Sequence, residues 1–398
     1  MSDYSIVMQK CTNGLPTILA IHHGWGGGVE KHIELLADIF ADRVNYLLAF
    51  PSRDGLINLS LAQSMHKASL QFEPNTQRAE LLEFLRNCNV RRLHIHHFFG
   101  NEHYLQSLSN ELHLPFDFTV HDYHVLSPQP HLVGREGRFI GDDLGMFARC
   151  ELVTFGIAPD RPSSLTEWQC KTRWLLAQAS RVIVPSYDTF RRLERFFPEL
   201  CGVIAAHPEV RRQSSTPTCI APAPAGLPLR ITLMGTIGPH KGAQVLAACA
   251  HISKSERLPL EFQVIGDVVD ANRLRELAVK ISGSYINSDL PRLLQEFDPH
   301  LIWFPAQCPE TFSYTLSEGM SANLPLVVAN IGALPERVGA RPWTWIENWN
   351  NTPSEWIEFF LTIRERNFHQ GAPPKPTGRP WEVTDEFYRR DYLDWITG

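Results

Sequence analysis

The sequence predicts an α/β protein with two domains, each a parallel sheet covered by helices on both faces. Short apolar runs alternate with segments of helical periodicity, and a second such series starts in the second half of the chain. Between the two series, residues 213–226 consist mostly of Ser, Thr, Pro and Ala, which is typical of a linker. The length of 398 residues agrees with this division, because single cores seldom grow beyond about 250–300 residues.

The composition narrows the class of protein. With 43% hydrophobic and 20% charged residues, the chain is ordinary for a globular protein, and its net charge of −6 argues against a broad nucleic-acid or anionic-membrane surface. The apolar runs are shorter than the ~18–20 residues that a membrane span needs, and the first residues lack the pattern of a signal peptide. The eight cysteines form no C-x-x-C pair. We therefore expect free thiols and a cytoplasmic protein.

The first domain is expected to alternate strands and helices. Its helices are expected around Val29 to Phe40, around Leu81 to Leu85 and around Phe190 to Phe196. Its strands are expected at residues 17–21, 46–50, 92–98, 116–120 and 181–185. Strands separated by helices favour parallel pairing, because parallel strands need a long crossover connection.

The second domain repeats this pattern. Its helices are expected at residues 243–252 and 271–282 and around Leu316 to Met320. Its strands are expected at residues 230–234, 261–265, 300–304 and 325–329. In such domains ligands bind at the carboxyl ends of the strands, so two of them joined by a hinge place the natural site in the cleft between them.

Two glycine-rich loops follow strands and precede helices. In the first, Gly27 and Gly28 let backbone N–H groups approach an anion at the helix start, although a tight turn without a ligand has the same sequence. This loop does not match the G-x-G-x-x-G pattern followed by an acidic residue at the end of the second strand, which argues against binding of a nicotinamide cofactor. The second loop begins at Gly235 and carries Lys241, which is able to hold a diphosphate as a point charge.

The most specific motif is a pair of glutamates eight positions apart, Glu310 and Glu318. Glu310 lies in a loop after a predicted strand, and Glu318 lies within the following helix. Eight residues correspond to a little over two helical turns, so both side chains are able to face one cleft. A carboxylate that accepts from two adjacent hydroxyls is a natural clamp for a ribose or another sugar. Two solvated glutamates near a helix start remain the alternative.

Histidines are the remaining candidates. His121 follows the strand at 116–120 directly, and so lies where a ligand is expected; a capping or buried histidine is the alternative. His22, His23, His94, His96 and His97 raise the question of a metal. None of them has the spacing of a known zinc motif, so no metal is expected.

Taken together, these motifs resemble a retaining glycosyltransferase of family 4 with the GT-B fold. The resemblance rests on the ordered set of motifs over nearly the whole chain, and it looks closest to transferases that build bacterial surface polysaccharide. The segments that carry it are Gly26 to His32, His121 to Tyr123, Val182 to Ser186, Gly235 to Gly242, Val264 to Gly266, Glu310 to Glu318 and Gly332 to Glu336. It implies two Rossmann-like domains facing a cleft, a nucleoside-diphosphate sugar as donor, a glycan or lipid-linked glycan as acceptor, and neither cofactor nor metal.

The resemblance also implies roles for matched residues. Glu318 would bind the ribose hydroxyls, and Glu310 the hydroxyls of the donor sugar. Lys241 would neutralise the diphosphate, and His121 would touch the sugar near the reacting carbon. The remaining donor contacts would come from the backbone at Gly27, Gly28, Gly235, Phe312 and Ser313.

One departure from the family pattern concerns the charge on the diphosphate. The family commonly has an arginine five residues before the lysine, and here that position is Thr236. His240 and Arg135 are candidate substitutes. The missing charge keeps one alternative open, a catalytically weak or inactive nucleotide- or glycan-binding module. A nucleotide-sugar 2-epimerase on a similar fold is a second alternative, and the glutamate pair together with the glycine loop of the first domain favours the transferase over it.

The expected boundaries follow from the linker and the C-terminus. The first domain comprises residues 1–212, the linker 213–227 and the second domain 228–379. Phe387, Tyr388, Tyr392 and Trp395 fall near one helical face. In the resembling family the last helix crosses back, so residues 380–398 are expected on the first domain, with packing on the second domain as the alternative. Peripheral contact with the inner face of a membrane, or with polysaccharide-assembly partners, is compatible with such a protein.

Overall fold

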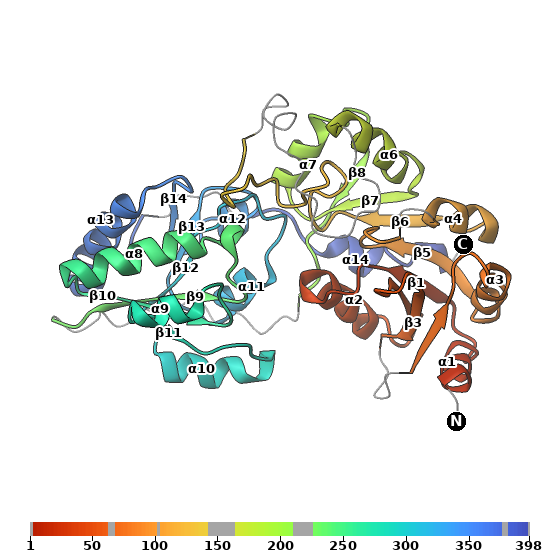
Figure 1. Ribbon diagram of the computed structural model, residues 1–398, viewed down its shortest axis with the longest axis horizontal. Coiled ribbons are helices and arrows are strands. Elements are labelled where there is room, and N and C mark those ends of the chain that lie inside the picture. Colours follow the sequence, from red (N-terminus) through yellow and green to blue (C-terminus); the bar gives the residue numbers. More distant parts are fainter. Residues whose placement is uncertain are drawn as a thin grey trace. The chain divides into compact units, whose positions relative to one another are not determined.

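The computed structural model describes residues 3–62, 68–101, 104–141, 164–209, 226–375 and 381–396 (Figure 1). The chain forms two compact units. Unit 1 comprises Met1–Pro130, Glu151–Val210 and Val383–Gly398, and unit 2 comprises His131–Cys150 and Arg211–Glu382. Each is an α/β unit with one sheet of mostly parallel strands, so the predicted fold class is confirmed.

Among the described residues, the grouping differs from the sequence-based boundaries at residues 131–141, and also at Trp381 and Glu382, which were expected on the first domain and group with unit 2. Residues 131–141 were expected in the first domain, yet they group with unit 2. The reason is local packing: Phe139 N donates to Gln307 O at 2.7 Å, and Gly137 lies against Pro239. Most of the expected linker, residues 213–225, lies outside the described residues.

Unit 1 is built on an eight-stranded sheet in the order β4-β3-β2-β1-β5-β6-β7-β8. Its strands are β1 (Thr17–Ile21), β2 (Asn45–Pro51), β3 (Ile57–Leu61), β4 (Ser69–Phe72), β5 (Val90–Ile95), β6 (Phe116–Thr119), β7 (Arg181–Val184) and β8 (Gly202–Ile204). Its helices are α1 (Asp3–Cys11), α2 (Gly27–Ile39), α3 (Arg78–Asn87), α4 (Leu105–Leu112), α6 (Leu165–Gln178), α7 (Tyr187–Glu194), α14 (Glu386–Arg390) and the short η4 (Asp394–Ile396). The pairs from β2 through β1 to β8 are parallel, as the sequence predicts.

The hairpins at one edge of this sheet were not predicted. β3 pairs antiparallel with β2 and with β4. The turn after Pro51 is closed by hydrogen bonds between Ser52 and Leu56, with Gly55 at φ +78°. A connection this short can join only antiparallel strands.

The C-terminal segment belongs to unit 1. Tyr388, Tyr392 and Leu393 are buried in the same hydrophobic cluster as Ile33 and Leu36 of α2. The expectation of one long helix here is wrong: α14 ends at Arg390, and a turn and η4 follow. The aromatic side chains still face the core, because the bend keeps them on one side.

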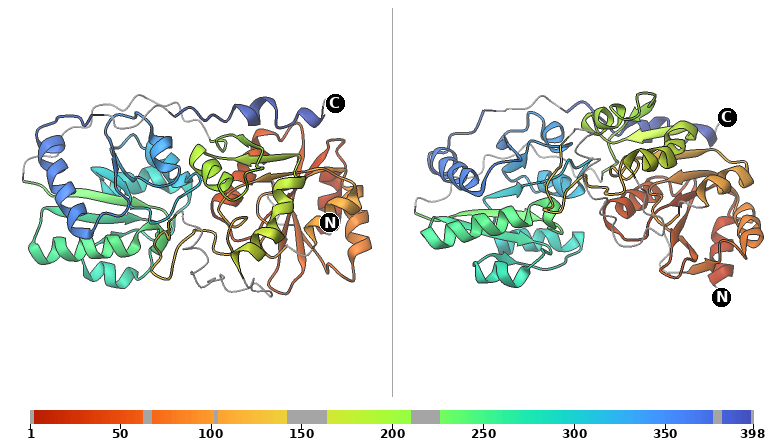
Figure 2. Two further views of the ribbon diagram at one scale, coloured as in Figure 1. Left: turned by 90° about the horizontal axis from the view of Figure 1, so that it is seen from above. Right: turned by 45° about the horizontal axis from the view of Figure 1, so that its top comes forward.

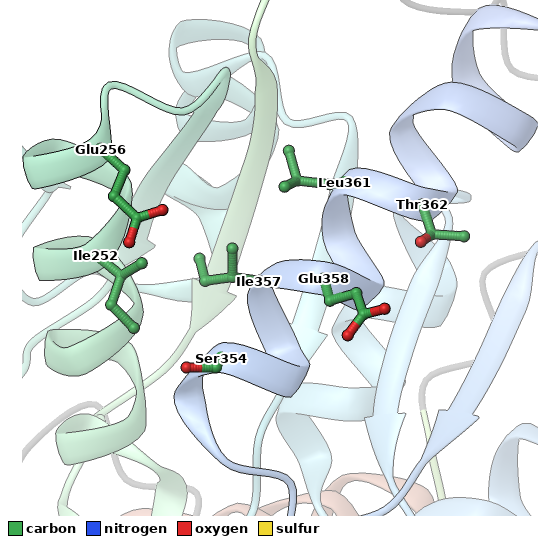
Figure 3. Close-up of a pocket in the computed structure, with 7 residues that line it drawn as sticks. All are labelled: Ile252, Glu256, Ser354, Ile357, Glu358, Leu361 and Thr362. Carbon is green, nitrogen blue, oxygen red and sulfur yellow. The ribbon is translucent and has the colours of Figure 1, made fainter.

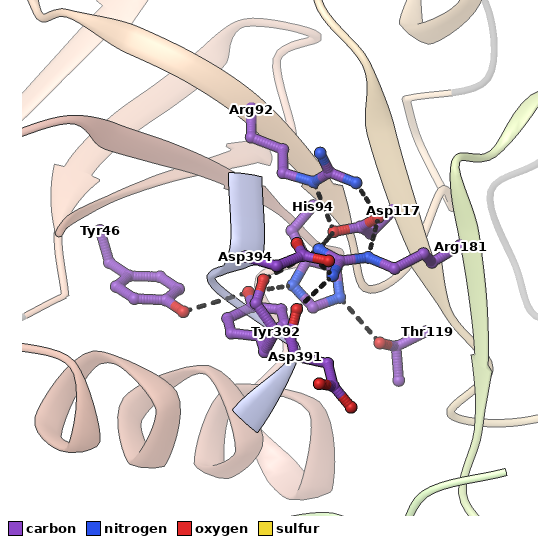
Figure 4. Close-up of polar contacts among 9 residues, drawn as sticks. All are labelled: Tyr46, Arg92, His94, Asp117, Thr119, Arg181, Asp391, Tyr392 and Asp394. Atoms are coloured by element: carbon purple, nitrogen blue, oxygen red, sulfur yellow. Dashed lines mark hydrogen bonds and ion pairs between the residues drawn. The ribbon is translucent and has the colours of Figure 1, made fainter. Parts of the chain in front are cut away.

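A buried ion pair network anchors this segment (Figure 4). Asp117 on β6 accepts bidentate hydrogen bonds from Arg92 on β5 and from Arg181 on β7, at 2.6–3.0 Å. Arg181 also donates to the carbonyl oxygens of Asp391 and Tyr392. Burial alone would raise the pKa of the Asp117 carboxyl, but the hydrogen bonds from the two arginines outweigh it and leave that pKa lowered.

Unit 2 is built on a six-stranded sheet in the order β11-β10-β9-β12-β13-β14, with every pair parallel. Its strands are β9 (Leu229–Met234), β10 (Leu260–Ile265), β11 (Lys280–Ile281), β12 (Leu301–Phe304), β13 (Leu326–Ala329) and β14 (Thr344–Glu347). Its helices are η1 (Pro239–Lys241), α8 (Ala243–Glu256), α9 (Ala271–Glu276), η2 (Asn287–Asp289), α10 (Leu290–Phe297), α11 (Tyr314–Ser321), α12 (Leu334–Val338), α13 (Pro353–Ile363) and η3 (Arg364–His369).

Two hydrophobic clusters cover the two faces of this sheet. Alternate strand residues join α8 and α13 in one cluster, and α10, α11 and α12 in the other. Figures 1 and 2 show α8 and α13 side by side. Within the described residues, no helix combines the length and apolarity needed to cross a membrane.

One expected helix of unit 2 is partly wrong. The sequence predicts a helix at residues 271–282, but α9 ends at Glu276 and Ala278 adopts φ +64°. Lys280 and Ile281 then form β11, which pairs with Gln263 and Val264 of β10. The β-branched residues Val279 and Ile281 favour this strand.

Candidate functional site

The loop after β9 is shaped by two glycines that touch. Gly235 has φ +100°, and a Cβ there would lie 2.8 Å from Cγ2 of Thr315 on α11. Gly266, after the neighbouring strand β10, lies so close to the Gly235 carbonyl that a Cβ would overlap it. Only glycine fits at these positions, so the ends of β9 and β10 reach the start of α11 with bare backbone.

Lys241 is the last residue of η1 and stands just before α8. Gly242 has φ +89° and packs against Pro305 after β12, which fixes the turn at the carboxyl edge of the sheet. The Lys241 Nζ atom lies 4.0 Å from Glu310 Oε1. Both side chains are partly exposed, at 27% and 15%, so this pair is weak and leaves Lys241 able to bind an anion.

The backbone of Glu310 is fixed by the loop after β13. Ala333 N donates to Glu310 O at 2.8 Å, and a Cβ at Gly332 would lie 2.5 Å from Glu310 N. This contact explains why the motif at 332–336 accompanies the glutamate pair in the sequence. It sets the position from which the Glu310 carboxylate projects.

Arg337, which the sequence analysis did not single out, holds the loop between Glu310 and α11. Its buried guanidinium donates to the carbonyl oxygens of Phe312 and Ser313 at 2.7 and 2.6 Å, and to Ser317 Oγ at 2.9 Å. It also lies 3.7 Å from the centroid of the Phe312 ring. Ser313 has φ +76°, an unfavourable conformation that persists because these bonds determine it.

Glu318 lies on α11 and receives a hydrogen bond from a tyrosine. Tyr285 Oη donates to Glu318 Oε2 at 3.1 Å. Burial and the nearby carboxylate raise the pKa of the Tyr285 hydroxyl, which therefore stays a donor at neutral pH. Tyr285 was not predicted, because it comes from a different loop, before η2, with no motif around it.

The segment at residues 131–141 covers the turn that carries Lys241. The His131 ring stacks on the His240 ring, with centroids 4.2 Å apart and an interplanar angle of 10°. Burial, with the nearby His131 and Lys241, lowers the pKa of His240 to about 3. His240 is therefore neutral at physiological pH and a poor substitute for the missing arginine, whereas Arg135 is exposed on this same segment.

In unit 1, the first glycine loop forms the start of α2. Gly27 is the first residue of the helix, and a Cβ there would meet nothing within 4 Å, so its surface is open; Gly28 follows in the same turn. Trp25, in the same loop, is 60% exposed and rests on Phe99 at a ring distance of 4.6 Å. The helix start is thus accessible, as an anion site requires.

His121 follows β6 and points at two other histidines. Its Nε2 atom lies 3.3 Å from His32 Nδ1 on α2, and 3.1 Å from His96 Nδ1 after β5. Burial and the neighbouring histidines lower the pKa of all three imidazoles well below the usual value. The sequence placed His32 in a motif and His96 on a strand, but spacing could not show that three separate elements bring them together with His121.

A groove on unit 2 is a poor candidate for an anion site. It lies between α8 and α13 and is lined by Ile252, Glu256, Ser354, Ile357, Glu358, Leu361 and Thr362 (Figure 3). Its charged groups are the two glutamates, which repel a diphosphate.

Comparison with known proteins identifies the type of domain in unit 2. Residues 228–358 match the family model of glycosyl transferases group 1. These residues contain Lys241, Glu310 and Glu318. No curated protein matches the chain.

Solved structures with the same fold span nearly the whole chain. HepE of Anabaena in complex with UDP-glucose has a TM-score of 0.56 at 14% identity, covering 88% of this chain and 90% of that one. Sucrose-phosphate synthase from Thermosynechococcus elongatus also has a TM-score of 0.56 at 14% identity, covering 87% and 89%. The lipopolysaccharide outer core galactosyltransferase WaaB, in its apo form, has a TM-score of 0.54 at 11% identity, covering 89% and 91%. The chain therefore has the GT-B fold, and residues 228–358 of its second unit are similar to glycosyl transferases group 1.

Proposed function

We propose that the chain is a retaining glycosyltransferase that moves a sugar from a nucleoside-diphosphate sugar to a glycan or lipid-linked acceptor in cell-surface polysaccharide synthesis. The observation that carries this proposal is the arrangement of Lys241 beside Glu310, at the carboxyl edge of a sheet within a group 1 domain. UDP-glucose and UDP complexes of HepE support a nucleotide sugar as the donor class.

The chemistry in unit 2 would serve the leaving group and the donor. Cleavage of the bond to the diphosphate places negative charge on the β-phosphate, and a positioned cation with backbone N–H groups stabilises that charge. Lys241 is this cation in the proposal, with the backbone at Gly235, Phe312 and Ser313 around it. Glu310 would accept from the hydroxyls of the donor sugar, and Glu318 from those of the ribose.

The proposal also gives roles to residues of unit 1. The open helix start at Gly27 and Gly28 offers N–H groups to the diphosphate. His121 would contact the donor sugar through the part of its ring that does not face His32 and His96. Attack from the face of the leaving group, with the phosphate taking the acceptor proton, accounts for retention without a protein nucleophile.

One observation favours a second function, a nucleotide- or glycan-binding module with little or no turnover. Thr236 stands where the resembling family has an arginine, and His240 is neutral. One lysine then carries the charge that two cations usually share. Binding without turnover is the outcome that distinguishes this module from an enzyme.

The first experiment screens the full chain for thermal stabilisation by UDP-, GDP- and dTDP-sugars. A donor that binds only the folded state raises the melting temperature. At a donor concentration of 100 times Kd, the free energy of unfolding rises by about 2.7 kcal/mol. The stabilising sugar is then incubated with candidate lipid-linked and glycan acceptors. Release of free nucleoside diphosphate that depends on the acceptor supports transfer, whereas release without an acceptor supports epimerase-like or hydrolytic chemistry.

Variants then assign the activity to the site. Lys241→Ala is expected to lower kcat by at least about 100-fold, as removal of one oxyanion donor does. Glu310→Ala, which removes the acceptor for the hydroxyls of the donor sugar, is expected to lower turnover as well, because the sugar is then less well positioned. Glu358→Ala is the matched control, because this glutamate lines the groove between α8 and α13. Unchanged turnover in Glu310→Ala would exclude the proposed catalytic role.

A further inference from the structure

His32, His96 and His121 of unit 1 contact one another through ring nitrogens, and ordinary hydrogen bonds account poorly for these contacts. His121 Nε2 lies within hydrogen-bond distance of two Nδ1 atoms, those of His32 and His96. A ring nitrogen carries either one hydrogen or one lone pair, and each points along a single direction in the ring plane. The single hydrogen or lone pair of His121 Nε2 is therefore shared between two contacts in a three-centre arrangement, which is weaker than two separate hydrogen bonds.

Four other histidines of unit 1 have hydrogen-bond partners other than histidine. His22, His23 and His97 each accept a hydrogen bond at Nδ1 from the backbone N–H two residues later. His94 bonds Tyr392 and Thr119 with its two nitrogens. In contrast, the Nε2 atoms of His32 and His96 have no hydrogen-bond partner within the described residues, so the Nδ1 side is where these two rings are held.

Two of the three separations between these nitrogens match those of a metal site. A tetrahedral Zn²⁺ with Zn–N bonds of about 2.0–2.1 Å separates its nitrogen ligands by about 3.3–3.4 Å. The two measured separations are 3.3 and 3.1 Å, and one ligand atom from each of the three residues lies within 4.8 Å of the others. Imidazole nitrogens are also the donors that Zn²⁺ and similar ions favour.

The surroundings of the three rings agree with such a site. His32 and His96 are 0% and 1% exposed, while His121 is partly exposed. His121 Nε2 faces two ring nitrogens at once, and a cation that accepts one lone pair from each ring would replace this shared contact with three separate bonds. Three protein ligands with one accessible side leave a fourth position for water or a solute, as in zinc sites that are not closed by protein.

We propose that His32 Nδ1, His96 Nδ1 and His121 Nε2 form a binding site for one divalent transition-metal ion, with Zn²⁺ as the best fit. The ion would link α2 to the carboxyl ends of β5 and β6. This inference concerns unit 1 by itself and does not depend on the proposed glycosyl transfer, where Lys241 carries the leaving-group charge.

The test uses the full chain without a polyhistidine tag, stripped with EDTA and dialysed into metal-free buffer, with no nucleotide or sugar present. Titration with CoCl₂ is expected to give one Co²⁺ per chain, with the visible absorption of a low-symmetry site, and ZnCl₂ is expected to displace it. Zn²⁺ alone is also expected to raise the melting temperature. Absence of stoichiometric binding of either ion would overturn the proposal.

Variants locate the ion. His96→Asn is expected to weaken Zn²⁺ binding at least about 100-fold, because loss of even an outer-shell partner costs 10–100-fold. His124→Asn is the matched control: His124 is also buried, it stacks on Phe98, and its nitrogens have no hydrogen bond within the described residues. Equal affinity of the wild type and His96→Asn would overturn the assignment.

A measurement on the wild type covers the case in which His96→Asn does not fold. X-ray absorption at the zinc edge is expected to show imidazole scattering from three rings, with Zn–N distances of about 2.0–2.1 Å. A coordination shell of sulfur, or of carboxylate oxygens alone, would place the ion elsewhere in the chain and contradict the site.

Discussion

At the scale of single residues, Glu318 offers the most direct test of nucleotide binding. Its carboxylate is already oriented by Tyr285 Oη at 3.1 Å, so a ribose would meet a positioned acceptor. We expect Glu318→Ala to weaken binding of the nucleotide by about 1.5–3 kcal/mol, the usual value of a hydrogen bond to a charged group. Isothermal titration with the nucleoside diphosphate identified by the thermal screen measures this as about a 10- to 100-fold rise in Kd.

The companion variant Tyr285→Phe separates orientation from direct contact. It removes the hydroxyl that orients Glu318 and keeps the ring, so we expect a rise in Kd of less than about tenfold. An equal loss in both variants would mean that Tyr285 itself binds the nucleotide. Unchanged Kd in Glu318→Ala would contradict the ribose role.

The residue at 236 tests whether a second cation is missing from the diphosphate site. Thr236 is exposed after β9, so an arginine there adds charge without disturbing the core. We expect Thr236→Arg to tighten binding of the nucleoside diphosphate about tenfold or more, because Arg forms charge-assisted, bidentate bonds to phosphate. Thr236→Met, long but uncharged, is the control, and equal Kd values for the two variants would show that the site already has its full charge.

At the scale of secondary-structure elements, Asp117 joins three strands and the C-terminal segment. Its side chain is only 1% exposed and is shared by Arg92 and Arg181. Asp117→Asn leaves two buried guanidinium groups without their carboxylate, so we expect the free energy of unfolding to fall by about 3–5 kcal/mol. Urea denaturation followed by circular dichroism measures this loss.

The control for this network is Asp394→Asn. Asp394 pairs with Arg181 at 3.2 Å but is 64% exposed, so its loss should cost less than about 1 kcal/mol.

The pH dependence adds a second check. The folded pKa of Asp117 is lowered, so its stabilisation is complete above the unfolded value of about 3.9 and disappears as the pH falls through the folded value. The difference between the wild type and Asp117→Asn should therefore be constant near neutral pH and shrink only in acid; a constant difference at all pH values would contradict it.

Strong apolar runs made most strands predictable. β1 is buried throughout, β9 and β10 are buried except at Arg230 and Glu261, and the structure has each strand within one residue of the expected range. β3 was not predicted, because Ile57 to Leu61 alternates apolar with polar residues and so lacks the continuous apolar run that is typical of a buried parallel strand. β11 was not predicted, because its two residues continue the helical pattern of the preceding segment. The helix ends before them because Ala278 adopts a positive φ, which the sequence pattern does not reveal.

The candidate site was predictable where its residues are neighbours in sequence. The glutamate pair and the two glycine loops are local motifs, and the structure places each at the carboxyl edge of its own sheet. Arg337, Tyr285 and the histidine trio depend on contacts between elements that are far apart in the chain. Periodicity and spacing carry no information about such contacts.

At the scale of the whole molecule, the two units have separate hydrophobic cores. One buried cluster joins β1, β2, α2 and the C-terminal segment of unit 1, and two others cover the two faces of the unit 2 sheet. The C-terminal segment is thus part of the unit 1 core although it follows unit 2 in sequence. A ligand that binds one unit and a core mutation in the other unit should consequently shift different thermal transitions.

We expect calorimetry of the full chain to show two thermal transitions that respond separately. Tyr392 is buried and bonds Tyr46 Oη at 3.1 Å and His94 Nδ1 at 2.7 Å, so Tyr392→Ala removes a large core side chain, at a cost of about 3–5 kcal/mol. This should lower the unit 1 transition by roughly 10 °C, given about 2–4 °C per kcal/mol for a unit of this size. The nucleoside diphosphate, whose proposed contacts lie mainly in unit 2, should instead raise the other transition. A single transition that shifts with both changes would show that the two units unfold together, and would contradict their description as independent cores.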